Sequence, residues 1–128
     1  MNEKILIVED NPQNMRLMEM TLKARAYTLL KAVDGEEALD VAIRERPDLI
    51  IMDIQLPKLS GLEVTGRLRQ TAGFEDIPII AITAYAMKGD KEKFLGSGCD
   101  GYIPKPVNTR QLPRLVADML AKGRNITT

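Results

Sequence analysis

Several side chains that could do chemistry follow directly after short apolar runs. Such runs, bounded by turn-forming residues, are typical of strands that are buried on both faces. The carboxyl ends of parallel strands meet at one edge of a sheet, which is where open α/β folds bind ligands. The side chains that this arrangement would bring together are Glu9, Asp10, Asp53, Thr83 and Lys105.

Carboxylates at one edge repel one another unless a cation lies among them, and Mg²⁺ prefers carboxylate, carbonyl and phosphate oxygens. Lys105 and the Thr83 hydroxyl add a positive charge and a hydrogen-bond donor, so such a site would bind a phosphoryl group. With Asp53 at the centre, the predicted chemistry is attack of its carboxylate on phosphorus, which forms an acyl phosphate. Mg²⁺ and Lys105 would offset the repulsion between the two anions.

Each of these residues alone also has an ordinary structural explanation. An Asp at a strand end is commonly a turn former. Glu9 and Asp10, followed by Asn11 and Pro12, could serve only to start a helix. Their joint arrival at one edge with Asp53 favours the chemical interpretation.

Apolar runs alternate with helical periodicity along the chain, a pattern that predicts an α/β fold with a parallel five-stranded sheet. The expected strands are 5–8, 27–32, 48–53, 77–83 and 101–104. The expected helices are 12–25, 34–45, one that follows residue 60, 87–95 and 108–122. We expect the first two helices to bury Leu17, Thr21, Leu22 and Ala24, and Ala38, Leu39, Ala42 and Ile43, respectively. Pro113 predicts that the last helix, capped by Asn108, either starts late or bends.

The composition fits one domain, residues 1–128, with a core over about 4–121 and a polar tail over 123–128. Lys+Arg and Asp+Glu number 18 each, so the net charge favours neither nucleic acid nor an anionic membrane as partner. Cys99 is the one cysteine, which excludes an internal disulfide and suits a reducing cytosol. Because residues 1–8 fit neither a signal peptide nor a membrane span, we expect a cytoplasmic protein.

Together the motifs resemble the receiver domain of bacterial two-component response regulators, over about residues 4–121. The segments that carry this resemblance are 5–11, 52–57, Gly61, 82–84 and 105–106, and residues 84–90 are similar to stand-alone receivers of the DivK type. The resemblance implies a flavodoxin-like (βα)5 three-layer sandwich with the strand order 2-1-3-4-5. Ala26 stands where receivers often have Gly, so that turn either avoids the left-handed region or holds Ala there at about 1 kcal/mol.

The resemblance also implies roles for the reactive residues. Asp53 would accept phosphate from a phosphohistidine on a histidine kinase or phosphotransfer protein. Mg²⁺ would be held by Asp10, Asp53 and the backbone carbonyl of Gln55, with Glu9 acting mainly through water. Lys105 would contact the phosphoryl group, aimed by a cis Lys105–Pro106 bond. Because the chain contains no histidine, it would supply only the acceptor side of a phosphorelay.

Signalling would pass through a switch pair, in which the Thr83 hydroxyl turns toward the phosphate and Tyr102 rotates into the vacated space. The output face would be formed by the fourth helix, the fifth strand and the fifth helix, around Tyr85, Met87, Lys88, Phe94 and Tyr102. The phosphodonor would dock on the first helix near Asn14 and Met18. Such a domain is a monomer that could dimerise on phosphorylation, and it is a signalling domain rather than a turnover enzyme.

Three alternatives stay open at this point. A Mg²⁺-dependent phosphatase could use Asp53 as its nucleophile, but such enzymes usually carry a second acid two residues later, where this chain has Gln55. The domain could be the receiver of a hybrid histidine kinase. It could also be a receiver-like scaffold that binds its partners without phosphorylation.

Overall fold

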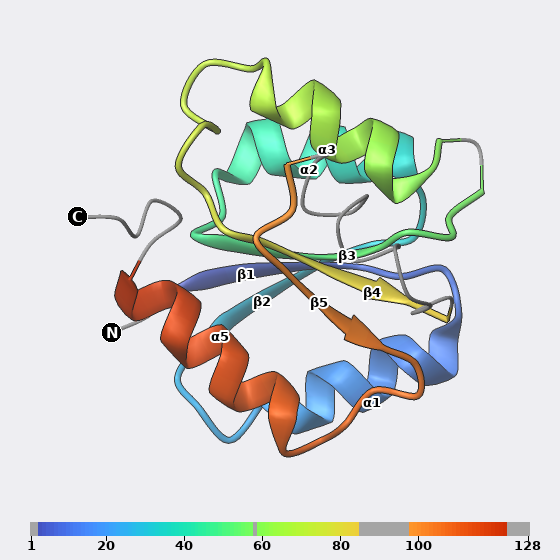
Figure 1. Cartoon of the computed structure of the whole chain (residues 1–128), viewed down its shortest axis with the longest axis vertical. Coiled ribbons are helices and arrows are strands. Elements are labelled where there is room, and N and C mark those ends of the chain that lie inside the picture. Colours follow the sequence, from blue (N-terminus) through green and yellow to red (C-terminus); the bar gives the residue numbers. More distant parts are fainter. Residues whose placement is uncertain (1–2, 58, 85–97, 123–128) are drawn as a thin grey trace.

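A parallel five-stranded sheet forms the middle layer of the computed structural model, which describes residues 3–57, 59–84 and 98–122 (Figure 1). Its strands are β1 (Lys4–Val8), β2 (Thr28–Ala32), β3 (Leu49–Asp53), β4 (Ile79–Thr83) and β5 (Gly101–Pro104). They lie in the order β2-β1-β3-β4-β5, and every neighbouring pair is parallel. The predicted α/β class and flavodoxin-like strand order are confirmed.

Helices cover both faces of this sheet. The helices α2 (Gly35–Glu45) and α3 (Gly61–Arg69) lie on one side, and α1 (Pro12–Leu22) and α5 (Gln111–Lys122) lie on the other (Figure 1). The helix expected over 87–95 lies outside the described residues. The described elements therefore form the three layers that the sequence predicts.

Two hydrophobic clusters, one on each face, hold the sheet and helices together. Side chains of β3 alternate between them: Ile50 and Met52 join the cluster under α2 and α3, whereas Leu49 and Ile51 join the cluster under α1 and α5. All five residues of β3 are buried. Burial of each such aliphatic side chain stabilises the fold by about 1.5–3 kcal/mol. The strand that ends in Asp53 is thus fixed from both sides.

The first helix differs from its prediction in length and in its buried face. It ends at Leu22 and buries Met15, Met18 and Leu22, whereas Leu17 is 36% exposed. The 3.6-residue repeat counted from Met15, not from Leu17, thus points at the sheet. Of Thr21 and Ala24, Thr21 is partly exposed and Ala24 is exposed beyond the helix end.

Two further predictions concern the buried face of α2 and the turn at Ala26. Ile43 on α2 is 47% exposed, and Val41 is buried in its place. Among the described non-glycine residues the one positive φ is at Arg46 (51°), so the turn at Ala26 avoids the left-handed region. The Arg46 side chain is held by a bond to the Ala72 carbonyl (3.0 Å) and by the Phe74 ring (4.9 Å).

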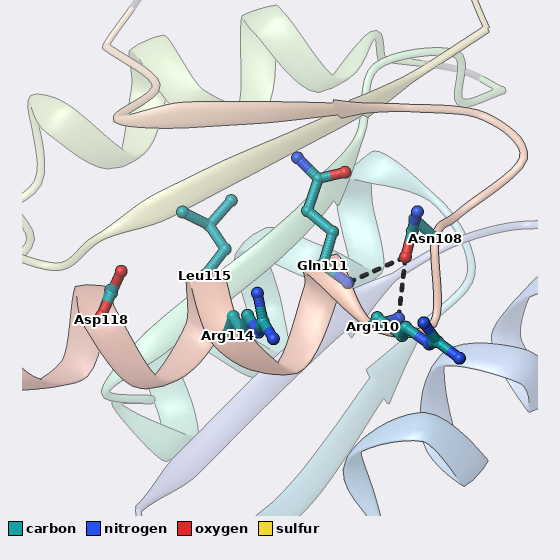
Figure 2. Close-up of a pocket in the computed structure, with 6 residues that line it drawn as sticks. All are labelled: Asn108, Arg110, Gln111, Arg114, Leu115 and Asp118. Carbon is teal, nitrogen blue, oxygen red and sulfur yellow. Dashed lines mark hydrogen bonds between the residues drawn. The ribbon is translucent and has the colours of Figure 1, made fainter.

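The last helix starts late. The Asn108 side chain accepts hydrogen bonds from the backbone N–H groups of Arg110 (2.8 Å) and Gln111 (2.9 Å), and α5 begins at Gln111 (Figure 2). The Leu112 N–H donates to the Asn108 carbonyl at 3.1 Å, but Pro113 lacks the N–H that would form the next such bond, to the carbonyl of residue 109. The regular helix therefore begins only at Gln111. A pocket of about 360 Å³ lies along this part of α5 and contains none of the predicted reactive residues.

At the end of α3, the Arg69 guanidinium ties three segments together. It donates to the backbone carbonyls of Gly98 (2.7 Å), Phe74 (2.9 Å) and Ile77 (2.6 Å), and it pairs with the Asp100 carboxylate at 2.8 Å. The same carboxylate oxygen accepts from the N–H of Ile79, at 2.9 Å, where β4 begins. The starts of β4 and β5 are thus joined to α3.

Candidate active site

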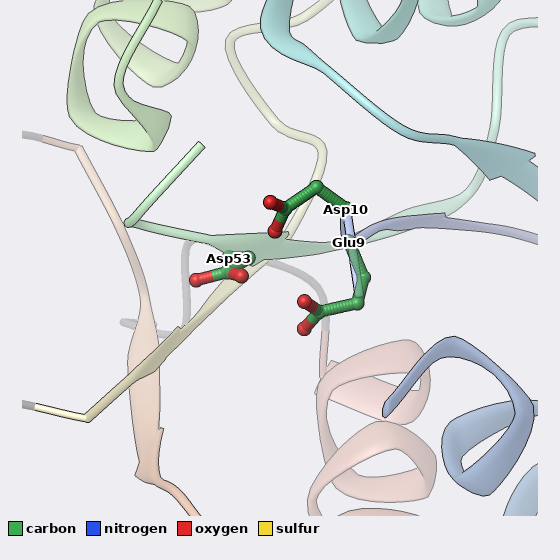
Figure 3. A group of neighbouring side chains, drawn as sticks. All are labelled: Glu9, Asp10 and Asp53. Atoms are coloured by element: carbon green, nitrogen blue, oxygen red, sulfur yellow. The ribbon is translucent and has the colours of Figure 1, made fainter. Parts of the chain in front are cut away.

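Three carboxylates meet where β1 and β3 end. Glu9 and Asp10 follow β1, and Asp53 is the last residue of β3 (Figure 3). One oxygen from each of the three lies within 4.8 Å of the others. Glu9 and Asp53 are buried, whereas Asp10 is exposed. The parallel topology therefore brings together the acidic residues that the sequence pattern singles out.

Lys105, which directly follows the edge strand β5, contacts this carboxylate cluster. Its Nζ donates to Asp53 Oδ2 at 3.0 Å and lies 3.6 Å from Glu9 Oε1. The Lys105 N–H also donates to the Thr83 carbonyl (2.7 Å), which extends the pairing of β4 with β5 by one residue. The Lys105–Pro106 bond is cis, as the family resemblance implies. One ammonium thus faces two buried carboxylates.

The loop after β3 packs closely on the phosphoacceptor candidate. The backbone N–H of Gln55 donates to Asp53 Oδ1 (2.9 Å), and the N–H of Gly61 donates to the Ile54 carbonyl (3.0 Å). A Cβ at Gly61 would lie 2.3 Å from the Asp53 carbonyl oxygen. Glycine therefore allows the first turn of α3 to rest directly on the end of β3.

Burial and the neighbouring charges shift the pKa values of Glu9 and Lys105. Burial, and then the neighbouring Asp53 carboxylate, raise the pKa of Glu9 from 4.5 to about 7. Burial alone would lower the pKa of Lys105, but the hydrogen bond and attraction to Asp53, with Glu9 and Asp10 adding to them, raise it above 10.5. Lys105 therefore stays positively charged, whereas Glu9 changes its charge near neutral pH.

The acidic cluster fits a hard divalent cation. Among the described residues, Glu9 Oε1 is the buried side-chain oxygen without a hydrogen-bond partner. It lies with oxygens of Asp10 and Asp53 in a group compact enough to share one ion. An all-oxygen donor set with one exposed member is typical of Mg²⁺ sites that keep some of their waters.

The predicted switch and partner residues differ in how far they are buried. Thr83 is buried at the end of β4, and Tyr102 on β5 is partly buried against the cluster under α2 and α3. Asn14 on α1 is partly exposed. Met18 is fully buried, so its prediction as a donor contact is wrong; it points into the core at the i+3 position from Met15. Outside the described residues lie Tyr85, Met87, Lys88 and Phe94.

One contact at the site was missed by the sequence reasoning. The resemblance implies a role only for the backbone carbonyl of Gln55, yet the side-chain Oε1 of Gln55 accepts a hydrogen bond from the N–H of Ala84 at 3.2 Å. Nothing in the spacing of the two residues indicates this contact. It depends on how two loops from different strands approach each other.

The sequence of residues 5–117 matches the family model of the response regulator receiver domain. The chain belongs to this family. Receivers are the signalling domains of two-component systems, so the predicted resemblance and function class are confirmed. In the described parts of this receiver, no helix combines the length and apolar character needed to cross a bilayer.

Relatives and solved structures agree with this assignment. The polar-differentiation response regulator DivK of Brucella anthropi is 47% identical over 116 residues, which cover 91% of this receiver and 92% of the relative. DivK of Brucella ovis is similar to the same extent. A response regulator structure from Chloroflexus aurantiacus superimposes with a TM-score of 0.90 at 30% identity, covering 94% of this receiver and 99% of that chain.

A further structure bears on the metal site. It is the receiver domain of a sensor histidine kinase from Pseudomonas aeruginosa, with a magnesium ion coordinated in its active site cleft. It superimposes with a TM-score of 0.86 at 36% identity, and the match covers 94% of this receiver and 99% of that chain.

Proposed function

We propose that this receiver accepts a phosphoryl group on Asp53 from a phosphohistidine of a histidine kinase or phosphotransfer protein. The observation that carries this proposal is the buried Asp53 carboxylate, bonded to the Lys105 ammonium at 3.0 Å beside two further carboxylates. Mg²⁺ would be held by Asp10, Asp53 and the Gln55 backbone carbonyl, with Glu9 acting through water. The ion would neutralise charge on the transferred group.

The transfer needs a nucleophile, a cation and a path for the leaving group. A carboxylate oxygen of Asp53 forms the O–P bond as the N–P bond to the donor imidazole breaks, and the imidazole keeps the electron pair and takes up a proton. Lys105 loses part of its contact with the carboxylate and binds a phosphoryl oxygen instead, because its Nζ is already within reach of the site. Asp53 thereby becomes a neutral acyl group that carries a dianionic phosphoryl group.

The donor would dock beside α1. A pocket of about 350 Å³ opens next to Glu9 and Asp10, and its wall is formed in part by Pro12, Arg16 and Val33. Asn14 stays a candidate contact because its side chain is partly exposed. Exposed Val33 offers an apolar contact on the same side of the site, at 53% exposure.

The phosphorylated state would be reported by Thr83 and Tyr102. We infer that the Thr83 hydroxyl turns to the phosphoryl group and that Tyr102 follows, which changes the face that includes β5 and α5. A downstream protein would bind this face. Binding of a second copy of the receiver, which would form a dimer, is one such interaction. We place this exchange in the cytoplasm, where the Cys99 thiol would stay reduced. We take residues 1–128 as one domain with a core over about 4–121.

The phosphatase alternative lacks support in the site. Position 55 carries an amide rather than an acid, and that amide is engaged with the N–H of Ala84. A general acid for the leaving group of a phosphate ester is therefore missing at that place. The similarity to the receiver domain of a sensor histidine kinase favours a second candidate with the same chemistry, in which this receiver is part of a hybrid histidine kinase.

Phosphorylation with a small donor tests the proposal directly. Phosphoramidate contains a P–N bond like that of phosphohistidine, and incubation with it and Mg²⁺ should add one phosphate to the intact protein, measured by mass spectrometry. Asp53→Asn should add none. Asp40→Asn, which changes an exposed carboxylate on α2, is the matched control and should react as wild type does. Equal labelling of Asp53→Asn and wild type would overturn the proposal.

A further inference from the structure

The end of the β3–β4 ladder leaves one backbone donor without its regular partner. In this ladder, the Ile54 N–H donates to the Ile82 carbonyl at 2.9 Å. In a parallel pair the next N–H of β4 that faces β3 belongs to Ala84, and its regular acceptor would be the Ile54 carbonyl. That carbonyl is instead engaged by the N–H of Gly61 at 3.0 Å.

The Gln55 side chain replaces the missing acceptor. Its Oε1 accepts from the Ala84 N–H at 3.2 Å. The backbone N–H of the same residue donates to Asp53 Oδ1 at 2.9 Å. Gln55 therefore links the reactive carboxylate on one side to the loop after β4 on the other.

A phosphoryl group on Asp53 would bring new acceptors to this place. Its oxygens carry negative charge, and backbone N–H groups that converge on such oxygens stabilise them without reorganising. The Ala84 N–H follows directly after Thr83 and points toward the β3 side, where Asp53 ends its strand. The side-chain Oε1 of Gln55 and a phosphoryl oxygen would thus compete for the Ala84 N–H.

We propose that Gln55 is a positioning residue that occupies the Ala84 N–H in the unphosphorylated receiver and gives it up to the phosphoryl group. This inference rests on the function proposed for Asp53. The amide side chain then weakens the hold of the site on a phosphoryl group, because its own hydrogen bond must break first. One neutral hydrogen bond corresponds to about fivefold in affinity.

Beryllofluoride, which imitates a phosphoryl group on a carboxylate, provides an equilibrium test in the presence of Mg²⁺. Gln55→Met keeps the side-chain length but removes the strong acceptor, so beryllofluoride should bind about fivefold more tightly than to wild type. Gln55→Glu keeps an acceptor and adds a negative charge, so binding should be weaker than in wild type. In Gln55→Met without ligand, the Ala84 amide resonance should shift as water replaces the side chain.

The results distinguish the role inferred for Gln55 from the phosphorylation proposed for Asp53. If Gln55→Met binds beryllofluoride as wild type does, or more weakly, the side chain only supports the loop and the inference is wrong. An Ala84 amide resonance that does not move in Gln55→Met would overturn it as well. If wild type itself binds no beryllofluoride, the proposed role of Asp53 fails instead.

Discussion

The shifted pKa of Glu9 makes a specific prediction about how stability depends on pH. The folded value of about 7 lies above the ordinary value of 4.5. Between these values the folded state holds a proton that the unfolded state has lost, so the free energy of unfolding falls as pH rises. From about pH 5.5 to about pH 7.5, this linkage gives a loss of about 2 kcal/mol without Mg²⁺.

Replacing the carboxyl isolates this contribution. Glu9→Gln cannot titrate, so its free energy of unfolding should stay nearly constant over the same range, whereas the exposed control Glu63→Gln should keep the wild-type loss. The absence of histidine removes the commonest other side chain that titrates near neutral pH. Because the chain has no tryptophan, urea unfolding is best followed by far-ultraviolet circular dichroism, with EDTA present.

Mg²⁺ should reverse the effect. A divalent cation favours the ionised carboxylate, so saturating Mg²⁺ should hold Glu9 ionised and remove the loss of stability between about pH 5.5 and about pH 7.5. If the loss in EDTA persists undiminished in Glu9→Gln, or is absent from wild type, Glu9 is not the titrating group and the reasoning from its burial fails.

Three further predictions concern charge, packing and the Arg69 contacts. Lys105→Met removes the cation that lies 3.0 Å from Asp53, so Mg²⁺ should bind about tenfold more tightly by calorimetry while phosphorylation by phosphoramidate slows; unchanged Mg²⁺ affinity would contradict this. Gly61→Ala places a Cβ 2.3 Å from a backbone oxygen and should lower the free energy of unfolding in urea by about 2 kcal/mol. Gly66→Ala on the same helix meets no atom within 4 Å and should raise the free energy of unfolding by up to about 1 kcal/mol. Arg69→Ala breaks a part-buried ion pair and should cost about 3 kcal/mol; a loss no larger than that of the exposed Arg67→Ala would show that the contacts are weak.

The strand order and the acidic cluster could be predicted because they depend on short-range rules. Runs such as the one that ends in Asp53 carry four apolar residues between turn formers, and few structures other than a doubly covered strand accommodate them. Once the strands are parallel, Glu9, Asp10 and Lys105 must reach the same edge. Correct prediction of where the strands end is therefore enough to predict which side chains form the site.

The errors arose where one position competes with its neighbour. On α1, Leu17 and Met18 are both apolar, and only the exact rotation of the helix against the sheet decides that Met18 is buried. The same holds for Val41 and Ile43 on α2. The Gln55 contact was missed for a different reason, since a side chain that spans two loops leaves no periodic signal in the sequence.

The contacts of Arg69 also bear on how motion can spread through the molecule. They fasten the first residues of β4 and β5 to α3, at the end of the sheet remote from Asp53. These contacts fix the N-terminal ends of both strands against α3. Thr83 ends β4 and Lys105 directly follows β5, so the reactive side chains lie at the opposite ends of these strands from the Arg69 contacts, and a shift of the strand ends at the site need not disturb the anchorage on α3.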